Sequence, residues 1–451
     1  MRLGGAEIAA ATGARALAEG AAEPPARAVI DSSAAGPGDL FFGLRGENHD
    51  GGAFAAAAIE AGAWGVVVAP EHAAAPADSG AWVFAAEDPL AALQALAIAD
   101  RRALGARVLG VTGSIGKTSV KDIVRALLPG RVHANAQNLN TEIGLPLTIL
   151  EAPDDTETLV LEMAMRGFGQ IAELAAIAEP DAAIITNVAP VHLEQMGSLE
   201  AIAAEKAAVI DALPADGVVV APVDAGALEP HLERAPRLLR FGPGGDVEAS
   251  EVEIAAGISA LIRAPGEEAR FEFPFAEPYN LTNALAAIAG GIALGADLGG
   301  MAVRAAGIGF SRFRGEQIKL ADGILLVNDC YNANPVSMRA ALDHLATFEA
   351  PRTVAVLGYM GELGPGGPEY HREIGAHARD AGVDVVVGIG APAREYDPDE
   401  LLADSGEAVE WLDSHLEPGD LVLLKGSRAV GMETIAPELV AVRGAAREES
   451  A

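Results

Sequence analysis

The chain has 451 residues, of which half are hydrophobic and 4% are aromatic, and its formal net charge at pH 7 is −33. At roughly 100–200 residues per domain, this length predicts two to four domains. The strong negative charge argues against nucleic acid as a partner, because that binding needs clustered Lys and Arg side chains.

The single cysteine, Cys330, cannot form an internal disulfide, which fits a reducing cytoplasm. Residues 1–20 lack a basic start followed by an apolar run, so they predict a short helix rather than a signal peptide. The most apolar stretch, residues 284–296, is too short to span a bilayer. We therefore expect a cytoplasmic monomer without a membrane span.

Strand-like and helix-like segments alternate along the chain, which predicts an α/β fold with mostly parallel sheets. In the first part, strands are expected over residues 38–44 and 64–69. A helix is expected over residues 87–104, with Asp88 as its N-cap and Pro89 in its first turn.

The rest of the chain continues this alternation in two further groups of apolar runs. The second group predicts one long helix over residues 198–213 and strands over residues 107–113, 158–165, 181–188 and 217–222. The third group predicts an open doubly wound sheet with strands over residues 323–330, 353–358, 384–390 and 420–426. We expect three domains, over residues 1–85, 86–312 and 313–451.

Residues 108–119 read VLGVTGSIGKTS and combine the parts of a phosphate-binding loop. The common pattern G-x-x-x-x-G-K-[ST] is not met, because its first glycine would fall on Val111. Gly113 and Gly116 still allow backbone N–H groups to approach phosphate oxygens, and the helix that follows directs its positive end at the anion. Lys117 can then reach the β- and γ-phosphates. The alternative is an ordinary glycine-rich turn between strand and helix.

Lysine is scarce, and arginine fills nearly every other basic position. The five lysines are Lys117, Lys121, Lys206, Lys319 and Lys425. A lysine that persists against this bias is a candidate for chemistry that arginine cannot perform, such as reaction as a neutral amine.

The shortened loop over residues 112–118 resembles that of the Mur ligase family, and further segments resemble the family in the same order along the chain. These segments are residues 29–54, 136–150, 162–171, 185–206, 283–289, 327–338, 356–364 and 422–428. The resemblance implies an N-terminal uridine-nucleotide domain, a central P-loop-type ATPase domain and a C-terminal Rossmann-like domain that binds the incoming substrate.

The resemblance also implies an activity. Residues 331–338, YNANPVSM, most resemble the member that ligates D-alanyl-D-alanine (D-Ala-D-Ala) to UDP-MurNAc-tripeptide. ATP would activate the peptide carboxylate as an acyl phosphate, and the products would be UDP-MurNAc-pentapeptide, ADP and phosphate. Two alternatives stay open, a Mur-type amide ligase with another acceptor and a regulatory ATPase that does not ligate.

Metal and catalytic roles follow from the same resemblance. Thr118, Glu162 and His192 are implied as ligands of two Mg²⁺ ions, and Lys206 as a ligand once CO₂ has converted it to a carbamate. Lys117, His192 and Lys206 are the implied catalytic residues. The competing interpretations are a solvated strand-end carboxylate at Glu162, an exposed or structural histidine and a solvated helix lysine.

The remaining site residues are implied to contact ATP and the two other substrates. The ATP contacts implied are Thr112, Gly113, Ser114, Gly116, Lys117, Thr118, Asn280, Asn283, Arg314 and Asp329. The substrate contacts implied are Ser32, Ser33, Arg45, Asn138, Thr141, Asn332, Asn334, Ser337, Lys425 and Ser427. Asp329 could instead cap the turn that follows it.

The chain departs from the family pattern at several of these places. Tyr279 stands where a histidine is usual beside the nucleotide, Thr141 where an asparagine is usual, and Tyr359 where an aspartate is usual. Ser33 occupies the place of an arginine, so Arg45 is the candidate for diphosphate contact. These departures put the acceptor specificity in question more than the ATP chemistry.

Overall fold

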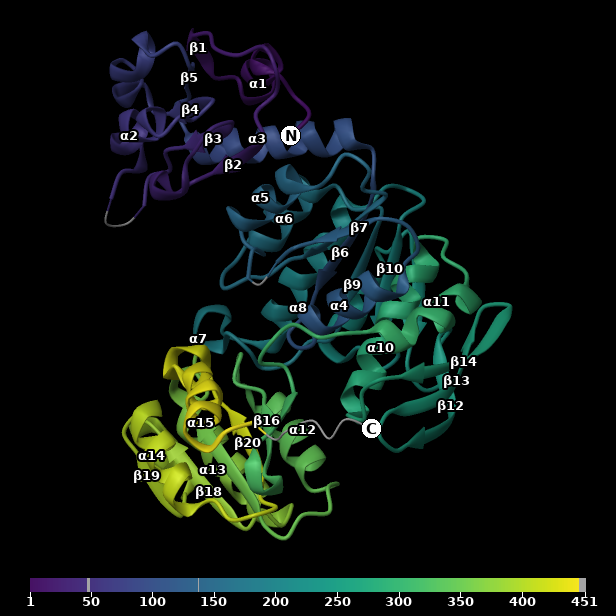
Figure 1. The fold of residues 1–451 in the computed structure, drawn as a ribbon. Helices are drawn as coiled ribbons and strands as arrows, with labels where there is room; N and C mark the ends of the chain where they lie inside the picture. Colours follow the sequence, from purple (N-terminus) through teal and green to yellow (C-terminus); the bar gives the residue numbers. More distant parts are fainter. Residues whose placement is uncertain (47–48, 137, 446–451) are drawn as a thin grey trace.

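The computed structural model describes residues 1–46, 49–136 and 138–445, and three α/β bodies follow one another along its length (Figure 1). The predicted α/β class with mostly parallel sheets is confirmed. In Figure 1 the N-terminal body lies at one end of the molecule, the C-terminal body lies at the other, and α3 (Pro89–Leu104) passes between the N-terminal sheet and the central body.

The N-terminal body is a five-stranded sheet in the order β1-β5-β4-β3-β2, with only β1 antiparallel to its neighbour. Its elements are α1 (Gly5–Thr12), β1 (Arg15–Ala18), β2 (Arg27–Val29), β3 (Asp39–Phe42), α2 (Ala55–Glu60), β4 (Gly65–Val68) and β5 (Trp82–Ala85). Asp88 caps α3 as predicted, since its side chain accepts hydrogen bonds from the N–H groups of Leu90 and Ala91.

The central body is built on a six-stranded parallel sheet in the order β11-β10-β9-β6-β8-β7. Its strands are β6 (Arg107–Thr112), β7 (Val132–Ala134), β8 (Thr158–Glu162), β9 (Ala182–Ile185), β10 (Val218–Pro222) and β11 (Arg237–Phe241). The register pairs Val111 on β6 with Glu162 on β8, so the phosphate-binding loop and that carboxylate leave the same edge of the sheet.

Helices cover both faces of this sheet. They are α4 (Lys117–Leu127), α5 (Gly144–Glu151), α6 (Gln170–Ala178), α7 (Leu193–Met196), α8 (Leu199–Ala207), α9 (Glu229–Leu232), α10 (Pro278–Ala293) and α11 (Leu298–Arg304). The single helix predicted over residues 198–213 is divided, because α8 ends at Ala207 and a 3₁₀ segment, Ala208–Ala212, follows it. Residues 284–296 are largely within α10, whose central residues are buried core.

An antiparallel three-stranded sheet was not anticipated. It comprises β12 (Glu248–Ile254), β13 (Ile258–Ala264) and β14 (Glu267–Phe273), and it contacts α11. Phe271, Phe273 and Phe275 stack in series on its buried side, with successive ring centroids 5.4 and 5.0 Å apart. These aromatics join the sheet to the core beneath α4 and α10.

The C-terminal body has the predicted doubly wound topology. Its sheet runs β15-β16-β20-β17-β18-β19, parallel except for the edge strand β15. The strands are β15 (Glu316–Lys319), β16 (Leu325–Asn328), β17 (Thr353–Gly358), β18 (Val385–Ile389), β19 (Glu400–Leu402) and β20 (Leu421–Lys425). The helices are α12 (Pro335–Leu345), α13 (Gly367–Asp380), α14 (Ser405–His415) and α15 (Ile435–Arg443).

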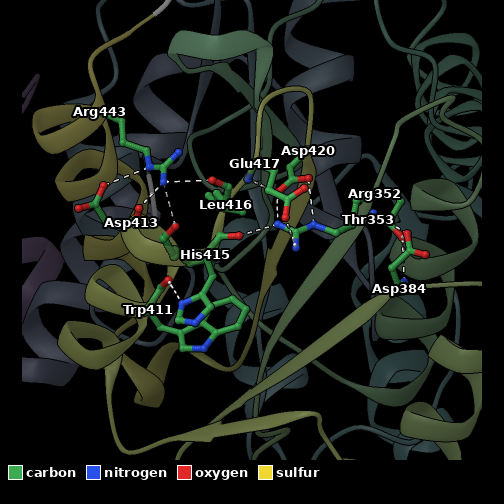
Figure 2. A network of polar contacts seen from close by, with 11 residues as sticks. Arg352, Thr353, Asp384, Trp411, Asp413, His415, Leu416, Glu417, Asp420 and Arg443 are labelled. Atoms are coloured by element: carbon green, nitrogen blue, oxygen red, sulfur yellow. Dashed lines mark hydrogen bonds and ion pairs between the residues drawn. The ribbon is translucent and has the colours of Figure 1, made fainter.

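A polar network closes the amino ends of these strands (Figure 2). The buried carboxylate of Asp420, which precedes β20, pairs with the guanidinium of Arg352 at 2.6 Å. Asp384, before β18, accepts hydrogen bonds from the backbone N–H and the hydroxyl of Thr353 at the start of β17. Ligands of doubly wound sheets bind at the opposite, carboxyl ends, so this network leaves that edge free.

Among the described residues, no helix is both long and apolar enough to cross a membrane.

Candidate active site

A cavity of about 1020 Å³ opens between the central and C-terminal bodies, at the carboxyl ends of both large sheets. Most of the predicted site residues line it. They are Ser114, Gly116, Lys117, Thr118, Asn138, Thr141, Glu162, His192, Asn280, Asn283, Arg314, Asp329, Asn332, Asn334, Ser337, Lys425 and Ser427. Segments that are distant in sequence therefore meet in one place.

The loop between β6 and α4 has the backbone of an anion cradle. Gly113 and Gly116 both adopt positive φ, 144° and 81°. A Cβ atom on Gly113 would lie 1.9 Å from the Thr186 hydroxyl, and one on Gly116 would lie 2.4 Å from Asn283 Oδ1. Only glycine fits these two positions, and the start of α4 that follows them is the kind of helix N-terminus that binds anions.

Lys117, the first residue of α4, folds back over this loop. Its ammonium donates to the carbonyl oxygens of Gly113 at 2.9 Å and Ser114 at 3.3 Å. Burial and, to a smaller extent, the nearby Arg314 guanidinium lower the pKa of Lys117, while Glu162 opposes the shift. An anionic ligand in the cavity would stabilise the charged ammonium and so oppose the effect of burial.

Thr118 and Glu162 are joined directly, across from the loop. The Thr118 hydroxyl donates to Glu162 Oε2 at 2.8 Å, and the Asn140 amide donates to Glu162 Oε1 at 2.8 Å. Both Thr118 and Glu162 are buried. A hydroxyl beside a buried carboxylate is a donor set that Mg²⁺ accepts, so these residues fit the implied metal.

A second layer of side chains, not predicted from the sequence, holds Glu162 in place. Asn135 accepts from the backbone N–H of Glu162 at 2.7 Å and donates to its carbonyl oxygen at 3.1 Å. The buried ammonium of Lys121 donates to the Asn135 carbonyl oxygen at 2.8 Å. The scarcity of lysine marked Lys121, but nothing in the sequence distinguished Asn135 or Asn140 from neighbouring asparagines.

His192 lies at the entrance of α7 with a left-handed backbone, φ 54°. Its Nδ1 atom is bonded to the carboxylate of Glu362 on the C-terminal body. That hydrogen bond is the main reason why the pKa of Glu362 is lowered, with burial opposing it. Glu362 was not predicted, because only the approach of two domains brings it to His192.

Lys206 does not line the cavity but lies buried on α8, 2% exposed. Among the described residues, no hydrogen bond or ion pair engages its ammonium. Burial and the charge of Lys117 set the pKa of Lys206 well below its usual value, against a smaller opposing effect of Glu205. Glu205 is occupied elsewhere, since it accepts from the N–H groups of Gly169 and Ile171 at 2.8 Å each. This shift favours the neutral amine form of Lys206 over its ammonium form.

The nucleotide's other end was predicted at Asn280 and Asn283, on the first turns of α10. Asn283 donates to Asn280 at 3.1 Å, and Asn280 donates to Glu277 at 3.3 Å. Tyr279 also lines the cavity, and burial together with Asp329 and Glu277 raises the pKa of its phenol well above the usual value. Tyr279 therefore stays protonated and can donate a hydrogen bond.

Arg314 enters the site from the segment that joins the central and C-terminal bodies. Its guanidinium donates to the Thr118 hydroxyl at 2.8 Å and stacks on the Tyr331 ring, 4.1 Å from the centroid. Asp329 pairs with the buried ammonium of Lys425, which also donates to the carbonyl oxygen of Asn332 at 3.3 Å. The carboxylate of Asp329 is therefore engaged by a cation. Among the described residues, it accepts no hydrogen bond that would cap the turn after it.

Asn334 and Ser337 form a reciprocal capping box at the start of α12. Ser427 accepts a hydrogen bond from the Gly361 N–H at 2.8 Å. These contacts fix the local backbone, so the three side chains have structural partners as well as a place on the cavity wall.

The remaining predicted residues lie outside the cavity. Thr112 is buried at the end of β6, and Gly113 is buried beneath the loop. Ser33 donates to Asp31 at 2.7 Å from the short 3₁₀ segment Ser32–Ala34. Arg45 pairs with Glu71 at 2.8 Å on the surface of the N-terminal body.

The cradle, the Thr118–Glu162 pair and the two-sheet cavity define a multidomain P-loop protein with its site between two α/β bodies. Three family models match it in succession: "Mur ligase family, catalytic domain" over residues 28–104, "Mur ligase middle domain" over 111–291, and "Mur ligase, glutamate ligase domain" over 313–428. The chain belongs to the Mur ligase family, and it is an ATP-dependent ligase.

Individual relatives agree along nearly the whole length. The UDP-N-acetylmuramoyl-tripeptide–D-alanyl-D-alanine ligase of Bacillus subtilis is 35% identical over 415 residues, covering 89% of this chain and 90% of that protein. The crystal structure of MurF from Acinetobacter baumannii superposes with a TM-score of 0.88 at 27% identity, covering 96% and 98% of the two chains. MurF from Thermotoga maritima, solved in complex with ADP, gives a TM-score of 0.82 at 30% identity, covering 92% and 96%.

Proposed function

We propose that this protein ligates D-Ala-D-Ala to UDP-MurNAc-tripeptide at the expense of ATP, in the synthesis of peptidoglycan precursor. The observation that carries the proposal is the meeting, in one cavity, of the loop cradle, the Thr118–Glu162 pair and the 329–337 segment. The names of the relatives support the choice of substrates.

The chain's own residues would act by positioning and by neutralising charge. Loop N–H groups and Lys117 would hold the phosphates of ATP, and Asn280 and Asn283 would contact its adenosine end. The terminal carboxylate of the tripeptide would take the γ-phosphoryl group, which gives an acyl phosphate and ADP. The amine of D-Ala-D-Ala would then attack the acyl carbon and release phosphate.

The acceptor would approach from the C-terminal body. Lys425, Asn332 and Ser427 lie on the cavity wall opposite the loop, within reach of a dipeptide carboxylate or amine. Ser32, Ser33 and Arg45 would contact the uridine nucleotide on the N-terminal body. Since those three lie outside the cavity, the UDP part would extend away from the reacting carboxylate.

Two Mg²⁺ ions would be held by Thr118 and Glu162 and by His192, and they would neutralise phosphate charge during transfer. The fit rests on the buried hydroxyl–carboxylate pair and on the chemistry of an imidazole near the same cavity. We further propose that Lys206 reacts with CO₂ to give a carbamate. This reaction requires a neutral amine, which arginine cannot supply, and burial lowers the pKa of Lys206 in the direction that favours that form.

A coupled assay of ADP release tests the proposal. Release that requires both UDP-MurNAc-tripeptide and D-Ala-D-Ala is expected, and activity should vanish in excess EDTA. A panel of other amines separates the second candidate, a Mur-type ligase with another acceptor, which the departures at Thr141, Tyr279 and Tyr359 keep open. Phosphate release that ignores both peptide substrates would instead indicate a regulatory ATPase.

The carbamate has its own test. A Lys206→Ala variant should lose ligation, and short carboxylic acids should restore part of it by replacing the anionic group. After the carbamate has been trapped by O-alkylation, mass spectrometry should show a mass increase equal to the alkylated carbamate on the peptide that contains Lys206. A wild-type enzyme with full activity in CO₂-depleted buffer would contradict the assignment.

A further inference from the structure

A buried histidine and a buried glutamate face each other where the central and C-terminal bodies meet. His344 lies on α12 and is 6% exposed, and Glu277 precedes α10 and is 5% exposed. Their nearest atoms, His344 Nε2 and Glu277 Oε1, are 3.6 Å apart. The catalytic scheme uses neither side chain.

The two groups are short of hydrogen bonds. Within the described part of the chain, neither ring nitrogen of His344 has a hydrogen-bond partner. From the described residues, the Glu277 carboxylate receives one side-chain hydrogen bond, from Asn280 at 3.3 Å. Buried polar groups are normally satisfied, so a pair left just beyond bonding distance indicates an arrangement that is completed by a small movement.

On the central side, the pair is connected to the nucleotide site. Glu277 accepts from Asn280, Asn280 accepts from Asn283, and Asn283 packs against Gly116 in the phosphate-binding loop. A shift of Glu277 toward His344 would therefore move the amides that face the nucleotide.

On the other side, the pair is connected to the acceptor wall, the part of the cavity lined by residues of the C-terminal body. His344 sits near the end of α12, whose N-cap Asn334 and first-turn residue Ser337 line the cavity. The joint between the two bodies passes beside the pair, because Gly315, with φ 71°, lies against Tyr279 and Glu277. A rotation at this joint would alter the distance between His344 and Glu277.

The environment favours a neutral imidazole that donates. Burial lowers the pKa of His344, and Glu277 only partly opposes the shift. The ring is held edge-on by Phe348, with centroids 4.8 Å apart, and by Tyr279, with centroids 6.3 Å apart. The aromatic contacts fix its orientation, with Nε2 3.6 Å from the Glu277 carboxylate.

We propose that His344 and Glu277 are positioning residues that form an interdomain hydrogen bond when the nucleotide-loaded central body and the C-terminal body close on each other. The link between this bond and catalysis rests on the proposed function, whereas the bond itself does not. It would couple the amides at the nucleotide to the acceptor wall on α12.

The test measures closure by fluorescence energy transfer between labels on the exposed positions Glu253→Cys and Glu410→Cys, one on each body. Native Cys330 can stay, because it is buried and its thiol pKa is raised to about 12. Closure is induced with a non-hydrolysable ATP analogue and MgCl₂. His344→Phe keeps the aromatic packing and removes the donor, and His344→Gln restores a donor. His377→Phe is the matched control, since His377 pairs with Asp343 at 2.7 Å inside one body.

In the wild type we expect nucleotide-dependent closure. In His344→Phe the closed fraction and kcat should fall at least threefold, and His344→Gln should recover most of the loss. Glu277→Gln combined with His344→Phe should be no worse than the poorer single variant. Closure of His344→Phe that equals the control, a wild type that does not close, or independent effects of the two substitutions would each overturn the proposal. Closure with the expected variant pattern but without tripeptide-dependent ADP release would overturn the proposed function alone.

Discussion

Replacing Gly116 by alanine should weaken nucleotide binding, and the structure gives the size of the effect. The positive φ of 81° costs a non-glycine residue about 1–2 kcal/mol. The new methyl group would lie 2.4 Å from Asn283 Oδ1, so that amide must move and lose its hydrogen bond to Asn280. Such a bond contributes about 1 kcal/mol. The total, about 2–3 kcal/mol, divides between lost stability and lost affinity for the nucleotide.

Calorimetric titration with ADP and the midpoint of thermal unfolding measure the two parts. The matched control is Gly105→Ala at the end of α3, where φ is 69° and no atom lies within 4 Å of the added carbon. Gly105→Ala should lower stability by about 1–2 kcal/mol and leave ADP binding unchanged. Gly116→Ala should weaken ADP binding about tenfold or more, since each 1.4 kcal/mol is a factor of ten. If the two variants bind ADP equally well, the steric reasoning is refuted.

Three further outcomes follow from single contacts. Thr118→Val removes hydrogen bonds to Glu162 and Arg314, so the rate of ADP release across a MgCl₂ titration should fall about a hundredfold or more. Thr118→Ser keeps the hydroxyl, and its rate should stay within about fivefold of the wild-type rate. A valine variant as active as the serine variant would be inconsistent with this role. Asp420→Ala removes the buried carboxylate that pairs with Arg352 at the edge of the sheet remote from the cavity, and Arg352 keeps only the His415 carbonyl oxygen and a longer contact with Glu417. Thermal unfolding should therefore show a loss of about 1–3 kcal/mol while kcat is retained. Burial lowers the folded-state pKa of His371, whose Nε2 accepts a hydrogen bond from the Met360 N–H. As pH falls, the unfolded chain therefore binds the proton first. The free energy of unfolding should decline below about pH 6.5, by at most about 1.4 kcal/mol per pH unit. His371→Gln should flatten that decline in urea unfolding at pH 5 and 7, and an unchanged slope would contradict the assignment.

The main elements of the fold could be predicted because their apolar runs are continuous. Strands buried on both faces, such as β6, β9 and β20, read as unbroken hydrophobic segments bounded by turn residues. The sheet β12-β13-β14 was missed because its first strand is half exposed and rich in glutamate, so it carries no such run. The division of the helix after Ala207 was missed as well, since no breaker residue marks it.

The candidate site was predictable where one short segment supplies several groups at once. The loop from Gly113 to Thr118 is such a segment, and lysine scarcity marked all five lysines as candidates, among them the buried Lys121 and Lys206. Contacts between distant segments left no local signal. Glu362 beside His192 and Glu277 beside His344 come together only when two bodies meet. The partners of Ser33 and Ser337, in contrast, are capping contacts within a few residues.

The burial of the lysines has a practical consequence. Lys121, Lys206 and Lys425 are buried, and Lys117 is half-buried against its own loop, so Lys319 is the one lysine with an exposed side chain. Amine-directed coupling at neutral pH should therefore attach this chain through Lys319, on the edge strand β15, and through its terminal amine. A surface or dye coupled in this way should hold nearly every molecule in the same few orientations, without any engineered tag.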